Sequence, residues 1–246
     1  MIRKFHPGVA ARLKSHNLCV GYDIIDTPVA DYHKNGTINW KSYISENIDF
    51  YIVGSEYYKS IMQEYLLPNQ EVYVIPHHSC NFDKERREVG ESVKTIGYVG
   101  LDDQIHARDE IQEYCDSRGI EMITDPGKSR EGVLQTLRKI DVGVIFLEND
   151  DYHKFNIQLK PNTKLTNFQS FGIPTVATGY TTFREFGGEA YLPANNRKQL
   201  FESLDILLSS RETRERLAVD GLKISEKCSI ENVAKMYDRV VDNYYA

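Results

Sequence analysis

Short apolar runs alternate with helix-like segments along most of this chain, and this alternation constrains the fold more than any other feature. The runs have strand length and are bounded by Gly, Pro, Asp or Ser. They are residues 50–53, 72–75, 95–99, 121–124, 142–147 and 174–177. Between them lie segments with helical periodicity, such as residues 129–140, where Val133, Leu134, Leu137 and Ile140 share one face. This order predicts an α/β fold with a mainly parallel sheet.

A change of character divides the alternation into two units. Apolar residues are sparse around residues 81–94, and residues 83–88 are charged, so we expect a linker there. Residues 1–80 then form a small first unit and residues 95–228 a larger second one. The tail, residues 229–246, has apolar positions at helical spacing and is predicted to form a helix.

Composition excludes several classes of protein. Of 246 residues, 41% are hydrophobic and 27% charged, which is typical of a globular chain and not of a disordered one. The 30 Lys and Arg are outnumbered by 36 Asp and Glu, and a net charge of −6 predicts no nucleic-acid partner. No apolar run approaches the roughly 18 residues of a membrane span, so no transmembrane segment is expected. Four widely spaced cysteines favour the cytoplasm, with peripheral membrane association left open.

Glycine turns after two strands are weak candidates for phosphate contacts. In open parallel sheets, ligands bind outside the carboxyl ends of the strands. Gly100 follows the strand at residues 95–99, where a glycine turn lets the backbone approach a phosphate. Gly127-Lys128-Ser129 resembles the end of a Walker A loop, but Met122 stands where the upstream glycine is required. A plain turn and helix cap is the better interpretation there.

The strongest segment runs from Lys160 to Ala177. Lys160 and Lys164 lie beside a predicted helix start, where the helix dipole disfavours positive charge. The placement makes sense if an anion binds there. Asn167 lies one helical turn after Lys164, so both side chains can face the same ligand.

This segment resembles the donor-site signature of retaining nucleotide-sugar glycosyltransferases with the GT-B architecture. In that family a helix ending in Gly-x-Pro, here Gly172-Ile173-Pro174, leads into a strand of the C-terminal Rossmann-like domain. Residues 178–185 are similar to the family's loop that carries a glutamate, here Glu185. Residues 72–76 are similar to the strand-and-proline step that joins the two domains.

The resemblance implies two Rossmann-like units of GT-B type. Residues 1–80 would be a truncated acceptor-side unit, and residues 95–228 a complete nucleotide-sugar-binding domain. Residues 229–246 would be a helix that crosses back to the first unit, with a dimer seam as the alternative. The first unit has about half the length that the family uses. This leaves three possibilities: a minimal enzyme, a site completed by a partner chain or homodimer, or lost catalysis.

The implied activity is metal-independent, retaining transfer of a sugar from a nucleoside-diphosphate sugar to a carbohydrate, lipid or protein acceptor, as in hexosyltransferases. No cofactor beyond the donor is implied. The catalytic candidates are His77, Lys164 and Glu185. The candidates for nucleotide binding are Gly100, Lys160, Lys164, Asn167, Thr178, Gly179 and Tyr180.

Two departures from the family pattern accompany these assignments. Asn167 stands where the family has a ribose-binding glutamate, and Leu159 stands where its partner glutamate would be, so the paired-glutamate motif is absent. His153, near Asp150 and Asp151, has no second histidine at ligand spacing, so no metal site is expected. Two other functions stay open: a non-catalytic nucleotide-sugar-binding subunit that needs a partner, and a nucleotide-sugar epimerase of the same architecture.

Overall fold

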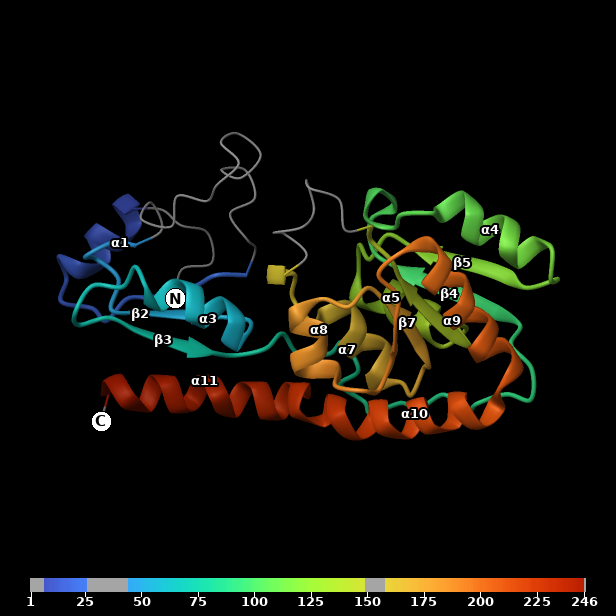
Figure 1. Ribbon diagram of the computed structural model, residues 1–246. Helices are drawn as coiled ribbons and strands as arrows, with labels where there is room; N and C mark the ends of the chain where they lie inside the picture. Colours follow the sequence, from blue (N-terminus) through green and yellow to red (C-terminus); the bar gives the residue numbers. More distant parts are fainter. Residues whose placement is uncertain (1–6, 26–43, 149–157, 246) are drawn as a thin grey trace.

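The computed structural model describes residues 7–25, 44–148 and 158–245, and these form two parallel β-sheets (Figure 1). The first sheet has the strand order β1-β2-β3 and the second the order β5-β4-β6-β7-β8. Every strand pair in both sheets is parallel. The predicted α/β class with two Rossmann-like units is therefore confirmed.

The elements follow one another in the order expected for such units. Those of the first unit are α1 (Pro7–Lys14), β1 (Gly21–Asp23), β2 (Phe50–Val53), α3 (Glu56–Gln63) and β3 (Glu71–Val74). Those of the second unit are β4 (Thr95–Val99), η2 (Asp102–Gln104), α4 (Arg108–Asp116), β5 (Glu121–Asp125), α5 (Arg130–Leu137), β6 (Val142–Ile145), α7 (Thr163–Ser170), β7 (Thr175–Ala177), α8 (Thr181–Gly187), β8 (Leu192–Pro193), α9 (Arg197–Ser209), α10 (Arg211–Ser225) and η3 (Glu226–Cys228). The last helix is α11 (Ile230–Tyr245). In the described part of the chain, no helix is both long and apolar enough to cross a bilayer.

The first sheet is covered on both faces, and its central strand is therefore apolar throughout. All four residues of β2 are buried. Tyr51 and Val53 pack with Met62 of α3 on one face. On the other face, Phe50 and Ile52 pack with residues of α11, chiefly Val233 and Val240. The C-terminal helix thus lies along the first unit, as Figure 1 shows in red.

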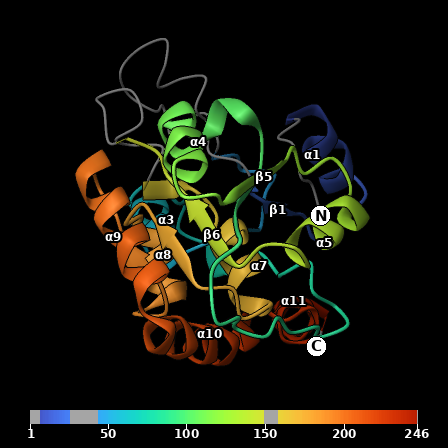
Figure 2. The ribbon, with the colours of Figure 1, turned by 90° about the vertical axis from the view of Figure 1, so that its right-hand side faces the viewer.

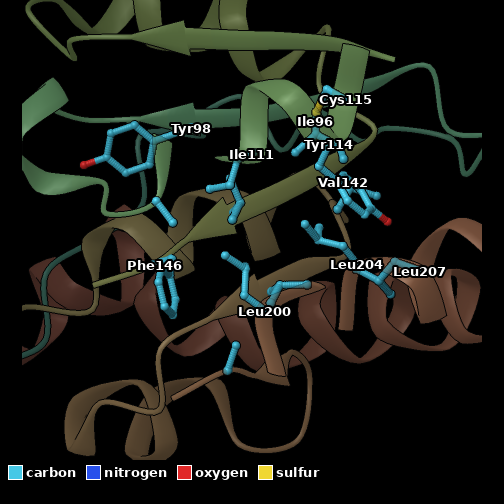
Figure 3. Packing of buried hydrophobic residues seen from close by; sticks show 14 of the residues in the cluster. Ile96, Tyr98, Ile111, Tyr114, Cys115, Val142, Phe146, Leu200, Leu204 and Leu207 are labelled. Carbon is cyan, nitrogen blue, oxygen red and sulfur yellow. The ribbon is translucent and has the colours of Figure 1, made fainter. Parts of the chain in front are cut away.

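The second sheet is sandwiched between two layers of helices. Val142 of β6 points into a cluster with Ile111 of α4 and Leu200 of α9 (Figure 3). Val144 belongs to the same cluster. Ile145 points to the opposite face and packs in a cluster with α5 and α7. This alternation has the two-residue period of a strand. Figure 2 shows α9 and α5 on opposite sides of β6.

Three predicted segments differ in the structure. The sequence predicts a loop over residues 178–185, but α8 begins at Thr181 and carries Glu185. Thr, Tyr and Phe have modest helix propensity, and burial of Phe183 and Phe186 stabilises this short helix instead.

The helix predicted from Ile105 begins later, at Arg108, because Ala107 adopts a left-handed conformation with φ 55°. The helix predicted over residues 40–46 has only residues 44–46 in the described part, and these are not helical.

Candidate functional site

Gly100 follows β4 in a conformation that only glycine adopts readily. Its φ is +152°, and a Cβ there would lie 2.5 Å from the Tyr98 hydroxyl and 2.8 Å from the Lys164 Nζ. Its N–H donates to the Asp125 carbonyl at 2.8 Å. A glycine is therefore needed for the Lys164 side chain to approach the backbone this closely.

Lys164 projects from the first turn of α7 toward that glycine. Its Nζ donates to the Tyr98 hydroxyl at 2.6 Å and lies 4.8 Å from the centroid of the same ring. Tyr98 is fully buried, and its O–H lies 3.2 Å from the Leu101 carbonyl and 3.0 Å from the Gln104 carbonyl. A buried tyrosine thus fixes an ammonium group at the carboxyl edge of the sheet.

Lys160 precedes α7 in the sequence and contacts η2, the segment that follows Gly100. Its Nζ donates to the Gln104 Oε1 at 2.9 Å. The structure therefore brings Gly100, Lys160 and Lys164 together around η2, at the edge where open parallel sheets bind ligands. Two positive charges beside one glycine turn can neutralise an anion of diphosphate type.

The three backbone amides after β7, predicted as phosphate donors, form hydrogen bonds within the protein in this structure. The N–H groups of Thr178, Gly179 and Tyr180 donate to the Ile145 carbonyl, the Asn195 Oδ1 and the Thr178 carbonyl, at 2.8, 3.2 and 2.7 Å. Each amide therefore has an acceptor within the protein, which a phosphate would have to displace. Their role as phosphate donors stays a prediction.

Side chains of this segment are also engaged. The Thr178 hydroxyl accepts the Leu147 N–H at 2.9 Å, which ties the end of β7 to the end of β6. The Tyr180 ring is 1% exposed and packs 4.5 Å from the Phe183 ring. Burial raises the pKa of Tyr180, so this phenol stays protonated.

Asn167 faces the linker. Its Oδ1 accepts the Cys80 N–H at 2.8 Å, although the residue lies one turn after Lys164 as predicted. Leu159, where the resemblance would place a glutamate, is 5% exposed and packs in the core of the first unit. An apolar contact between the units thus occupies the position of that acid.

His77 lies against the start of α7. Its Nδ1 is 3.0 Å from the Thr163 Oγ1, and its N–H donates to the Asn162 Oδ1 at 3.0 Å. The structure therefore places His77 beside the helix that carries Lys164.

Glu185 contacts the first unit. Its carboxylate accepts the Glu56 N–H at the start of α3, and its own carbonyl accepts from the Lys227 Nζ at 3.1 Å. Burial raises the pKa of Glu185, because desolvation disfavours the charged carboxylate.

Sequence reasoning missed two residues of this site. Tyr98 lies in the apolar strand at residues 95–99, and Asn162 lies just before the helix that carries Lys164. Neither residue was predicted to belong to the site. The signal for Asn162 was its place between two lysines. His153, Asp150 and Asp151 lie outside the described residues, and in the remainder no group of three or more His, Cys, Asp or Glu side chains could hold a metal ion.

Comparison of the sequence finds no matching family model and no matching curated protein. Comparison of the structure finds similar folds. Sucrose-phosphate synthase from Thermosynechococcus elongatus superposes with a TM-score of 0.68 at 13% identity, covering 97% of this chain and 71% of that one. HepE from Anabaena, solved with UDP and glucose, gives 0.65 at 9% identity, covering 97% and 74%. A glycosyltransferase from Rickettsia africae gives 0.57 at 10% identity, covering 94% and 78%. These likenesses confirm the predicted fold, a shortened GT-B arrangement.

Proposed function

We propose that this chain is a glycosyltransferase that moves a sugar from a nucleoside-diphosphate sugar, with UDP as the nucleotide, to an acceptor. The carrying observation is the position of the Lys164 ammonium, held by Tyr98 against the Gly100 turn. The GT-B fold supports the reaction class, and HepE, solved with UDP-glucose, supports the choice of nucleotide.

The chemical problem is a diphosphate leaving group on which negative charge grows as the glycosidic bond breaks. In the proposed reaction Lys164 and Lys160 stabilise that charge, in the place a metal ion takes in other transferases. Tyr98 keeps Lys164 in position before the donor arrives, so little reorganisation is needed at the transition state. Retention of configuration follows from the family resemblance and is part of the proposal.

The remaining candidates have supporting roles in this proposal. His77, beside Thr163, would face the reacting sugar from the segment that follows β3. Glu185 would hold the two units in register through the Glu56 N–H. The acceptor, whether carbohydrate, lipid or protein, would enter from the side of the first unit.

Replacement of Lys164 tests the proposal. Lys164→Ala should weaken UDP binding and lower the rate of UDP release from UDP-sugars at least about a hundredfold, since one such contact contributes about 3 kcal/mol in the transition state. Lys139→Ala is the matched control, because Lys139 is exposed at the opposite edge of the sheet, just before β6. Equal UDP affinity and equal turnover for Lys164→Ala and wild type would refute the proposal.

A second candidate function is a nucleotide-sugar-binding subunit that acts only with a partner chain. It is favoured by the first sheet, which has three strands among the described residues. A thermal-shift screen with UDP, GDP, ADP, CMP and dTDP compounds separates binding from turnover. A ligand at 100 times its Kd stabilises by about 2.7 kcal/mol. Stabilisation by UDP without UDP release from any UDP-sugar would favour this second function.

A further inference from the structure

Asn162 lies between the two lysines of the site and is fully buried. It occupies the N-cap position of α7, yet its side chain makes no capping hydrogen bond. A buried carboxamide needs partners for its oxygen and both of its hydrogens. In this protein His77 and Cys228, from other segments, and Thr166, one turn further along α7, supply those partners.

The Asn162 side chain pairs with the backbone of His77 as a neighbouring strand would. Its Oδ1 accepts the His77 N–H at 3.0 Å, and its Nδ2 donates to the His77 carbonyl at 3.0 Å. The Nδ2 also lies 2.8 Å from the Thr166 Oγ1 and 3.4 Å from the Cys228 Sγ. One side chain therefore joins the segment that follows β3, α7 and η3.

These contacts lie where the chain passes between the two units. His77 comes just after β3 and Pro76, where the chain leaves the first unit. Cys228 ends η3, which connects α10 to α11, and α11 packs on the first sheet. We call these two segments, at His77–Ser79 and at Cys228, the two crossings. The Ser79 N–H donates to the Cys228 carbonyl at 2.9 Å, so the crossings also contact each other. Asn162 thus contacts both crossings at once.

The residues before and after Asn162 also contact the two units. Leu159, three residues before it, packs in the core of the first unit. Lys164, two residues after it, holds the Tyr98 hydroxyl at the donor edge. The stretch from 159 to 164 therefore runs from the first unit to the lysine site with Asn162 at its centre.

We propose that Asn162 is a positioning residue that sets the orientation of the first unit relative to the lysine helix α7. This rests on the proposed function and extends it to the alignment of the acceptor side with the donor site. Loss of the carboxamide leaves the His77 N–H and carbonyl without this partner, so the two crossings can shift. UDP itself would still bind, because its lysines belong to the second unit. Misplacement of reacting groups by about 1 Å lowers a rate about a hundredfold.

The test compares Asn162→Ala with Asn196→Ala. Asn196 also lies at a helix start, where its Oδ1 accepts the Gln199 N–H at 2.9 Å, but α9 does not connect the units. Both variants should lower Tm. Asn162→Ala should lower kcat for UDP release from the UDP-sugar by about tenfold or more and change the UDP Kd by less than about threefold. Small-angle X-ray scattering should show an altered radius of gyration for Asn162→Ala only.

Thr166→Ala provides a milder variant if Asn162→Ala does not fold, because it removes one acceptor of the Nδ2 and leaves His77 paired. Its kcat should fall about threefold with the UDP Kd unchanged. Wild-type kcat in both Asn162→Ala and Thr166→Ala, with unchanged scattering of Asn162→Ala, would overturn the proposal while the function stands. Where only Thr166→Ala folds, a wild-type kcat of that variant would overturn it. A wild-type protein that binds no nucleotide would instead overturn the proposed function, and this proposal with it.

Discussion

The Glu185 carboxylate accepts the backbone N–H of Glu56, with its two oxygens at 2.9 and 3.2 Å. The bond joins α8 of the second unit to the first residue of α3 in the first. Ser55 caps the same helix, since its hydroxyl accepts the Tyr58 N–H at 3.1 Å. Negative charge is favourable at a helix start, so Glu185 acts as a second cap supplied from the other unit.

The burial of Glu185 outweighs this favourable contact and predicts a pH-dependent stability. The folded-state pKa of Glu185 lies above the ordinary value of 4.5, mainly because of desolvation. The protonated carboxyl group therefore stabilises the folded state. This stabilisation is fully present below pH 4.5 and is lost as pH rises through the folded-state pKa. Glu185→Gln keeps an acceptor for Glu56 and removes the ionisation. Its stability relative to wild type should therefore increase with pH, as measured by urea unfolding.

Glu189→Gln, at an exposed position four residues further on, is the control for the Glu-to-Gln replacement itself. A constant or falling difference for Glu185→Gln would mean that the interface does not disfavour the charged carboxylate.

Gly100→Ala should disturb the site and the fold together. The added Cβ would meet the Tyr98 hydroxyl and the Lys164 Nζ, and φ +152° is strained for alanine at a cost of about 1–3 kcal/mol. Gly119→Ala separates the two effects, because Gly119 has φ +65° and a Cβ added there would have no atom within 4 Å. Both variants should lose stability, and only Gly100→Ala should lose UDP affinity in calorimetric titrations. Equal affinities would place the nucleotide away from Gly100.

Tyr98→Phe should loosen Lys164 without removing its charge. The lost hydroxyl is the acceptor of the Lys164 Nζ, and its removal should cost about 1–2 kcal/mol of unfolding free energy. UDP binding should weaken, though less than in Lys164→Ala. Tyr114→Phe is the matched control, since the Tyr114 hydroxyl donates to Asp205 at 2.7 Å in the layer of α4 and α9. Tighter UDP binding by Tyr98→Phe would show that the tyrosine competes with the ligand.

Much of the fold could be predicted because burial on both faces makes the central strands largely apolar. β2 and β4 begin and end at the predicted residues, Phe50–Val53 and Thr95–Val99. Ser55 was predictable as a cap from residue type and position alone. The helix α8 was not, because its stability comes from Phe183 and Phe186 packing in the second unit.

The candidate site was predictable only in part. The lysines stand out because positive charge at a helix start is locally unfavourable, and the structure brings Lys160, Lys164 and Gly100 together. The partners of Asn167 and Glu185 were not predictable, because Cys80 and Glu56 are 87 and 129 residues away in the sequence. Contacts at such separation depend on how the two units dock.

Arg214 should stabilise the protein without affecting the site. The residue is 2% exposed, and its guanidinium donates to the carbonyls of Leu207, Gly90 and Glu91 at 2.7, 2.9 and 2.9 Å. Arg214→Ala leaves these carbonyls without this donor and should cost about 3 kcal/mol in urea unfolding. Arg216→Ala, exposed on the same helix, should cost at most about 0.5 kcal/mol. A small loss for Arg214→Ala would mean that other groups or water satisfy these carbonyls.

A crystal structure of the protein with UDP would show where the diphosphate binds. We expect the diphosphate at the carboxyl edge of the second sheet, beside the Gly100 backbone and within about 3 Å of the Lys164 Nζ. A diphosphate bound away from Gly100 and Lys164, with the Lys164 Nζ still on the Tyr98 hydroxyl alone, would contradict it.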